Sequence, residues 1–413
     1  MTSKSLRWSL YGLAGVAIVS IVQQITGSTD LTSVGTADAA LLLAVPIALA
    51  GLGGLFSERA GVVNIGLEGM MIMGTWAAGY WGYQHGPYMG VFMAMVFGAV
   101  AALVHAVATV TFGVDHVVSG VAINLIAPGI VRYLSVIVYQ DSNIPGAGPT
   151  QSPSVDPVGT NGLPVLSGGT LFGWHSPDVL GAIGQHNILI VSDLARVLRG
   201  LTGDVPYITM LCLLLFPLSW WVLWRTRFGL RLRSAGEAPV AAESLGVQVY
   251  RMKYAGVVIS GALAGLAGGY LAVVASSNYQ EGQTGGRGFI GLAAMLFGNW
   301  RPGGLFLGSA LFGFADALQL RASSAVHAAL LIVVIGFLAY AAMQVRRGHR
   351  AVAAVTSIVA VAVLVLFLRV QELPGPFVSM TPYVTTLVVL SLATQRLRMP
   401  AADGLPYRKG GAH

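Results

Sequence analysis

The chain has few charged residues and almost no cysteine. Asp, Glu, Lys and Arg make up 9% of its 413 residues, whereas 55% are hydrophobic. Soluble domains carry about 25% charged residues, so this composition excludes an ordinary soluble protein. The single cysteine, Cys212, lies in an apolar run, which excludes a disulfide framework and a thiolate metal site. A chain of this kind needs lipid around much of its surface.

The sequence also lacks the common signatures of enzymes. It contains no G-x-x-x-x-G-K-[S/T] phosphate loop, so the chain is not a conventional ATPase by itself. It has no H-E-x-x-H or G-x-S-x-G motif, and its histidines are scattered without metal-ligand spacing. An intramembrane enzyme built on Glu68 and His105 is the one catalytic alternative. We therefore expect no catalytic residue, metal ion or cofactor in this chain.

Apolar runs long enough to cross a bilayer follow one another along the chain, which predicts an all-α polytopic membrane protein with about 10–12 helices. A first run with a basic start resembles a signal peptide, but its long apolar core indicates a retained helix. The expected crossings are residues 8–25, 39–56, 62–83, 88–112, 114–139, 206–224, 254–275, 302–320, 326–344, 351–370 and 377–395.

One further apolar run, residues 289–297, is too short for a normal crossing. Glycine-rich sequence flanks it on both sides, which predicts a broken or re-entrant helix. If residues 287–300 cross completely, both termini and most of the lysines and arginines face the cytoplasm, as the positive-inside rule requires. If the segment turns back, the basic residues of 346–350 fall outside. The charge distribution therefore favours a complete crossing in the cell membrane.

The same orientation places one long loop on each side of the membrane. Residues 140–205 are rich in Gly, Pro, Ser and Asp and are expected outside, as a contact surface for a binding protein or as a connector. Residues 225–253 are expected in the cytoplasm. In them Pro239 suits a first helical position, Ala242 favours helix and Gly246 can end it. This short helix is either an interfacial helix on anionic lipid or a docking element for a cytoplasmic partner.

Two glycine-rich segments predict helix interruptions near the bilayer midplane. Interrupted helices leave N–H and C=O groups that a ligand or water can satisfy. Two interruptions, one in each half of the chain, are what an inverted repeat would produce. The glycines concerned are Gly61, Gly66 and Gly69 in the first segment and Gly286 and Gly288 in the second.

Polar residues in and near these segments are candidates for a substrate pathway. A carboxylate in an apolar span is costly, so Glu68 is expected to face a cavity or a partner group. Asn64 lies four residues earlier, on the same face of the predicted helix. Both either line the pathway or brace the broken helices through Arg59 or backbone N–H groups. Asn124 either contacts a substrate hydroxyl or bonds a neighbouring helix.

Four segments closely resemble the ABC permease family that imports simple sugars, nucleosides and branched-chain amino acids, and within it the bacterial nucleoside permeases. The resemblance covers about residues 40–320 and preserves the order of the motifs. The segments are GLGGLFSERAGVVNIGLEGMMIMGTWAAG, GLRLRSAGEAPVAAESLGV, VVISGALAGLAGGYLAVV and GGRGFIGLAAMLFGNWRPGGLFLGSALFGFADALQ.

The resemblance implies one permease domain, residues 1–413, of about ten helices in two inverted halves. It implies a second permease subunit, identical or homologous, two ATP-binding subunits that hold ATP and Mg, and an extracellular substrate-binding lipoprotein. The loop from Gly236 through Glu237 to Gly246 would carry the coupling helix. Residues 326–370 depart from the family pattern as two additional helices.

The resemblance also implies a nucleoside substrate. A nucleoside presents ribose hydroxyls, which Asn64, Glu68 and Asn124 would bond, and a flat base, on which Phe289 would pack. A simple sugar such as ribose would use the same polar groups and gain nothing from the aromatic ring. An ion-coupled secondary transporter is the alternative from a different class, with Glu68 and Asp316 as its main membrane carboxylates.

Overall fold

The computed structural model describes residues 15, 17–140, 144–171, 173–186, 188, 190–320, 323–370 and 397–410, with a few positions between 374 and 385. The first expected crossing, residues 8–25, is described only at 15 and from 17 onward, where Ala17–Thr26 is a short apolar helix. Most of the last one, residues 377–395, lies outside the described residues.

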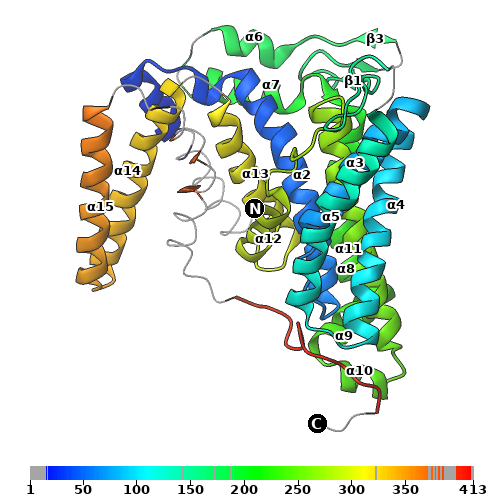
Figure 1. Ribbon diagram of the computed structural model, residues 1–413. Helices are drawn as coiled ribbons and strands as arrows, with labels where there is room; N and C mark the ends of the chain where they lie inside the picture. The colour runs from blue at the N-terminus through cyan, green and yellow to red at the C-terminus, as the bar shows by residue number, and fades with distance from the viewer. Residues whose placement is uncertain are drawn as a thin grey trace. The chain divides into compact units, whose positions relative to one another are not determined.

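Helices make up nearly all of the described secondary structure (Figure 1). They are η1 (Asp30–Thr32), α2 (Val34–Arg59), α3 (Leu67–His85), α4 (Pro87–Ala106), η2 (Val107–Thr111), α5 (His116–Tyr139), α6 (Val179–Gln185), α7 (Val191–Thr202), α8 (Tyr207–Arg225), α9 (Arg227–Glu237), α10 (Pro239–Ser244), α11 (Val249–Tyr270), η3 (Leu271–Ala275), α12 (Arg287–Phe297), α13 (Pro302–Gln319), α14 (Ser323–Arg346) and α15 (Arg350–Arg369). The strands are β1 (Thr160–Asn161), β2 (Thr170–Leu171), β3 (Trp174–His175) and β4 (Val205–Pro206), of which β2 and β3 pair antiparallel.

Seven of the described helices are long and apolar enough to cross a membrane. This confirms an all-α, multi-pass membrane protein. The short run near residue 289 forms α12, which has only 11 residues. The membrane-length helices are Val34–Arg59, Pro87–Thr111, His116–Tyr139, Tyr207–Arg225, Val249–Ala275, Ala325–Arg346 and Arg350–Arg369.

The chain forms two compact units, the first made of residues 1–41, 161–205 and 314–387. In it α14 packs along α15, so residues 326–370 do form the expected helix pair. Its polar centre is the Thr32 hydroxyl, which hydrogen-bonds the Asp193 carboxylate at 3.0 Å. Its apolar core gathers Val22, Leu31, Leu318, Ala325, Val326 and Ala328.

The second unit contains residues 42–160, 206–313 and 388–413. Its centre is the packing of α3, α4 and α11, whose glycines let the backbones approach closely. A Cβ atom on Gly265 of α11 would overlap the carbonyl oxygen of Ala94 in α4, and one on Gly98 of α4 would overlap that of Gly261. The glycines of α11 therefore serve close helix packing.

We expect Gly265→Leu to destabilise the second unit, because overpacking a tight contact costs about 1–3 kcal/mol or more. The measurement is the thermal unfolding midpoint of the detergent-purified protein. Gly129→Leu is the matched control, since a Cβ atom on Gly129 of α5 meets nothing within 4 Å. Equal midpoints for the two variants would contradict the close α4–α11 contact.

Candidate functional site

The first interruption follows directly after α2. The chain turns at Gly61, whose φ of 81° is in the left-handed region that favours glycine. Residues 62–66 are not helical, and α3 begins only at Leu67. The prediction that Asn64 and Glu68 share one helical face is therefore wrong, because Asn64 precedes the helix. Its side chain instead bends back onto the turn, where the Gly66 N–H donates to Asn64 Oδ1 at 3.1 Å.

The Glu68 carboxylate joins the two interruptions. It is 7% exposed and accepts hydrogen bonds from the N–H groups of Gly286 at 2.9 Å and Gly288 at 2.7 Å. These N–H groups lie at the start of α12, where a helix leaves donors unsatisfied and favours negative charge. Gly286 itself has φ 79°. The two glycine-rich segments therefore meet at one carboxylate.

Two asparagines complete the support of the first interruption. Asn124 of α5 accepts from the Gly69 N–H at 2.8 Å and donates to the Ile65 carbonyl at 2.9 Å. Asn64 Nδ2 donates to the Ser260 hydroxyl of α11 at 2.9 Å. Of the two roles that the sequence leaves open for these polar side chains, the geometry favours the bracing of broken backbone.

The second interruption runs along α3 from one end of it to the other. Tyr279 packs against Gly79, near the end of α3, and Gly288 packs against Glu68, near its start. The chain then reaches Trp300, whose indole N–H donates to the Glu58 carboxylate at the end of α2. The second interruption and α12 together therefore extend over the length of α3; a complete crossing stays a prediction.

The loop of residues 225–253, expected in the cytoplasm, contains two helices. The expected short helix is confirmed as α10, which has Pro239 in its first turn and ends just before Gly246 (φ 82°). The helix before it, α9, was not expected from the sequence. Its signal is Thr226, whose hydroxyl oxygen accepts from the Gly229 N–H at 3.1 Å as an N-cap.

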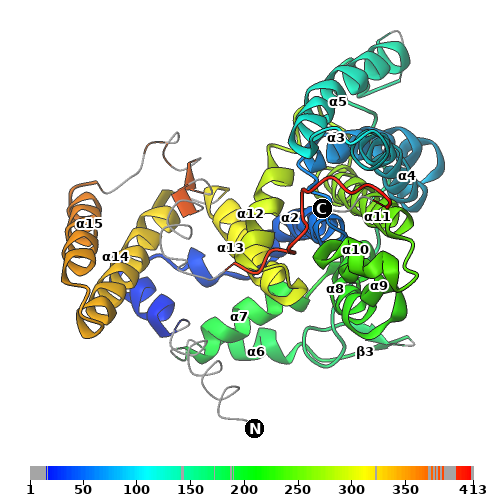
Figure 2. The same cartoon turned by 90° about the horizontal axis from the view of Figure 1, so that it is seen from below.

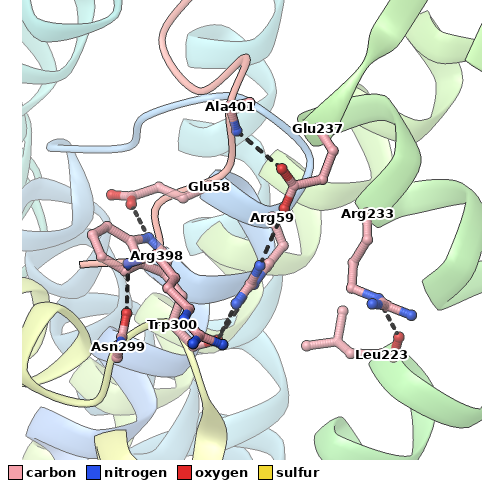
Figure 3. Close-up of polar contacts among 9 residues, drawn as sticks. All are labelled: Glu58, Arg59, Leu223, Arg233, Glu237, Asn299, Trp300, Arg398 and Ala401. Carbon is pink, nitrogen blue, oxygen red and sulfur yellow. Dashed lines mark hydrogen bonds and ion pairs between the residues drawn. The ribbon is translucent and has the colours of Figure 1, made fainter. Parts of the chain in front are cut away.

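Arg59 connects this loop to the membrane helices (Figure 3). Its guanidinium donates to the Trp300 carbonyl at 2.8 Å and lies 3.6 Å from the Glu237 carboxylate at the end of α9. The backbone of Gly236 packs so closely on α2 that a Cβ atom there would overlap the Arg59 carbonyl oxygen. The end of α2, the end of α9 and the turn between α12 and α13 therefore form one cluster.

The side chains of α10 divide into two sets. Ala242 is 3% exposed and packs with Ala235 and Val249, so it belongs to the small core beneath the helix. Val240 is 50% exposed, and Leu245, just after the helix, is 85% exposed. These two apolar side chains are available to a partner protein.

A family profile described as "Branched-chain amino acid transport system / permease component" matches residues 36–367. The chain belongs to this permease family. It is a membrane transport subunit, and two curated relatives match the permease over nearly its whole length. The guanosine ABC transporter permease protein NupQ of Bacillus subtilis is 34% identical over 90% of this chain and 96% of its own. The nucleoside ABC transporter permease protein NupC of Lactococcus lactis is 32% identical, over 89% and 95% respectively.

A second Bacillus subtilis protein, the guanosine ABC transporter permease protein NupP, is 24% identical to the permease over 71% of this chain and 76% of its own. No solved structure matches the permease. Because the match with NupQ and NupC includes both interruptions and the cytoplasmic loop, the geometry above concerns the part of the chain that these permeases share.

We expect Gly288→Ala to abolish transport, because the new Cβ atom would lie 2.7 Å from the Glu68 backbone and displace the carboxylate from α12. Gly66→Ala should be milder, since its nearest contact would be 3.3 Å. Uptake of labelled substrate at matched membrane levels is the measurement.

Gly129→Ala, in open space on α5, is the control for both variants. Gly348 is less suitable, because its φ of 83° strains any side chain there. Uptake at the wild-type rate by Gly288→Ala would show that the close contact between the two interruptions is not needed for transport.

Proposed function

We propose that this permease imports nucleosides as a membrane subunit of an ATP-driven transporter. The observation that carries the proposal is the match with NupQ and NupC over 96% and 95% of their own lengths. In this proposal two ATP-binding subunits hold ATP and Mg on the cytoplasmic side. A second permease subunit, identical or homologous, completes the membrane part, and an extracellular lipoprotein delivers the substrate.

The cytoplasmic loop supports the role of α10 as the coupling helix. A helix that transmits movement needs an apolar surface for its partner and a stiff connection to the membrane. Val240 and Leu245 supply the surface. The contacts of Glu237 with Arg59, and of Arg59 with the Trp300 carbonyl, supply the connection.

The substrate pathway is proposed to pass beside the two interruptions. The broken backbone is held by Glu68, Asn64 and Asn124. We therefore propose that these side chains fix the shape of the pathway and do not bind the substrate tightly. Phe289 is 47% exposed on the first turn of α12 and is our candidate for packing against the base. In this proposal the permease contacts the nucleoside only loosely, and the binding lipoprotein determines which substrate is selected.

We expect cells that lack this chain to lose high-affinity uptake of labelled purine or pyrimidine nucleosides, with ribose and leucine uptake unchanged. A plasmid copy of the wild-type chain should restore nucleoside uptake, and a Gly288→Ala copy should not. Normal nucleoside uptake together with lost ribose uptake would replace the proposal by a simple-sugar importer. Autonomous ion-driven uptake by the purified chain in liposomes would replace it by a secondary transporter.

We expect Leu245→Asp to reduce substrate-stimulated ATP hydrolysis by the assembled transporter several-fold, because it places a charge on the exposed apolar surface of the coupling loop. The chain itself should remain folded, since Leu245 is 85% exposed. Phe112→Asp is the control, because Phe112 is 75% exposed in the turn between η2 and α5, away from α10. Ala242→Asp is not a test of docking, because Ala242 is buried. Unchanged stimulation in Leu245→Asp would remove the coupling role from α10.

A further inference from the structure

The C-terminal segment, residues 397–410, lies against the cytoplasmic loop (Figures 1 and 2). The Ala402 N–H donates to the Gly236 carbonyl at 2.9 Å, and the Ala401 N–H donates to the Glu237 carboxylate at 3.1 Å (Figure 3). Ala402 and Asp403 are each 8% exposed. The segment is therefore packed onto the end of α9 rather than exposed to solvent along its length.

Its far end is attached to α10 and α11. The Tyr407 hydroxyl donates to the Glu243 carboxylate of α10. The Tyr407 ring lies 5.4 Å from the ring of Tyr250, at the start of α11, and the Tyr250 hydroxyl donates to the Tyr407 carbonyl at 3.3 Å. Tyr407 thus also covers the small core that contains Ala242.

Its near end is attached to the second interruption. The Arg398 N–H donates to Asn299 Oδ1 at 2.7 Å, in the turn that follows α12 (Figure 3). The neighbouring residue, Trp300, is 1% exposed and holds Arg59 through its carbonyl. One segment of about a dozen residues therefore touches the coupling helix, the end of α9 and the turn after the broken helix.

We propose that residues 397–407, here named the C-terminal strap, position α10 relative to α12 and so transmit the movement of the coupling helix to the broken helix. The inference rests on the proposed function, because it assigns the strap a part in coupling ATP hydrolysis to transport. The strap stays attached through the cycle and moves with α9 and α10 as one body. Its residues are positioning residues, since they touch neither substrate nor ATP.

A buried carboxyl group makes this attachment depend on pH. Asp403 lies beside the Glu58 carboxyl of α2, and the other charged groups that face it are Arg59 of α2 and Lys253 of α11. Burial, and then the neighbouring Glu58 carboxyl, raise the pKa of Asp403 well above its usual range. The attached strap therefore holds a proton that a free strap releases near pH 4, close to the ordinary pKa of aspartate.

The sign of the pH effect follows from that difference in proton binding. Between the ordinary pKa of Asp403 and its raised value, the attached state binds more protons, so attachment weakens as the pH rises. We expect trypsin to cleave after Arg398 several-fold faster at pH 8.5 than at pH 6.5, relative to the Asp403→Asn variant at each pH. Asparagine needs no proton, so the comparison removes the pH dependence of trypsin itself. The same ratio of cleavage rates at both pH values would contradict the uptake of a proton by Asp403 on attachment.

The test of the strap uses the complete transporter in lipid nanodiscs and liposomes with guanosine as substrate. Ala402→Pro removes the N–H that bonds Gly236 and alters the turn, and Tyr407→Phe removes only the bond to Glu243. Lys409→Pro is the matched control, because Lys409 is exposed on the same segment. The measurements are retention of the ATP-binding subunits, basal ATP hydrolysis, and guanosine transported per ATP hydrolysed.

We expect Ala402→Pro to retain its partners and basal hydrolysis while guanosine transported per ATP falls by about tenfold, as for a lost structural hydrogen bond. Tyr407→Phe should fall less, and Lys409→Pro should match the wild type. Equal transport per ATP in Ala402→Pro and Lys409→Pro would overturn the role of the strap. A wild-type complex that hydrolyses no ATP and transports no guanosine would overturn the proposed function instead, while the trypsin comparison would still report whether the strap is attached.

Discussion

The bond between the Glu68 carboxylate and the start of α12 is the interaction on which the second unit depends. A carboxylate within a membrane helix is costly unless charged or hydrogen-bonding groups satisfy it. The first N–H groups of α12 are equally costly when they have no acceptor. The Glu68 carboxylate and these N–H groups satisfy each other, through hydrogen bonds from the Gly286 N–H at 2.9 Å and the Gly288 N–H at 2.7 Å. Gly288 is required because any side chain there would occupy the space of the Glu68 backbone.

The contacts around this bond form a continuous physical path from α10 to the interruptions. Glu243 of α10 accepts from the Tyr407 hydroxyl of the strap, and Glu237 of α9 pairs with Arg59. Arg59 holds Trp300, and α12 leads from the turn before Trp300 back to Gly288 and Glu68. Packed and hydrogen-bonded groups of this kind can carry energetic coupling between distant sites. Here the path involves two short helices, α10 with 6 residues and α12 with 11.

Features with a local signal could be predicted from the sequence. Pro239 and Gly246 mark the two ends of α10, and the glycines around residues 289–297 mark a short helix. The prediction of Asn64 in a continuous helix is wrong although the turn has a local signal: Gly61 ends α2, with the Gly61 N–H donating to the Glu58 carbonyl and the Val62 N–H donating to the Ser57 carbonyl. Features that depend on contacts between residues far apart in the sequence could not be predicted. The contact of Glu68 with the start of α12 has no local signal, because it joins residues 220 positions apart. The strap gives no signal either, since its main donors are the backbone N–H groups of Ala401 and Ala402.

The distance along the chain between Glu68 and Gly288, 220 residues, has a consequence for how the protein is made. At about 5–20 residues per second, a ribosome needs roughly 10–40 seconds to synthesise that length. During this interval Glu68 is already in or near the bilayer while the donors that satisfy it have not been synthesised. The first half must therefore wait with the Glu68 carboxylate hydrated or held at the membrane surface. Glu68 gains its hydrogen-bond donors only when α12 has been synthesised and inserted. The final packing of the first half therefore depends on the synthesis of the second half.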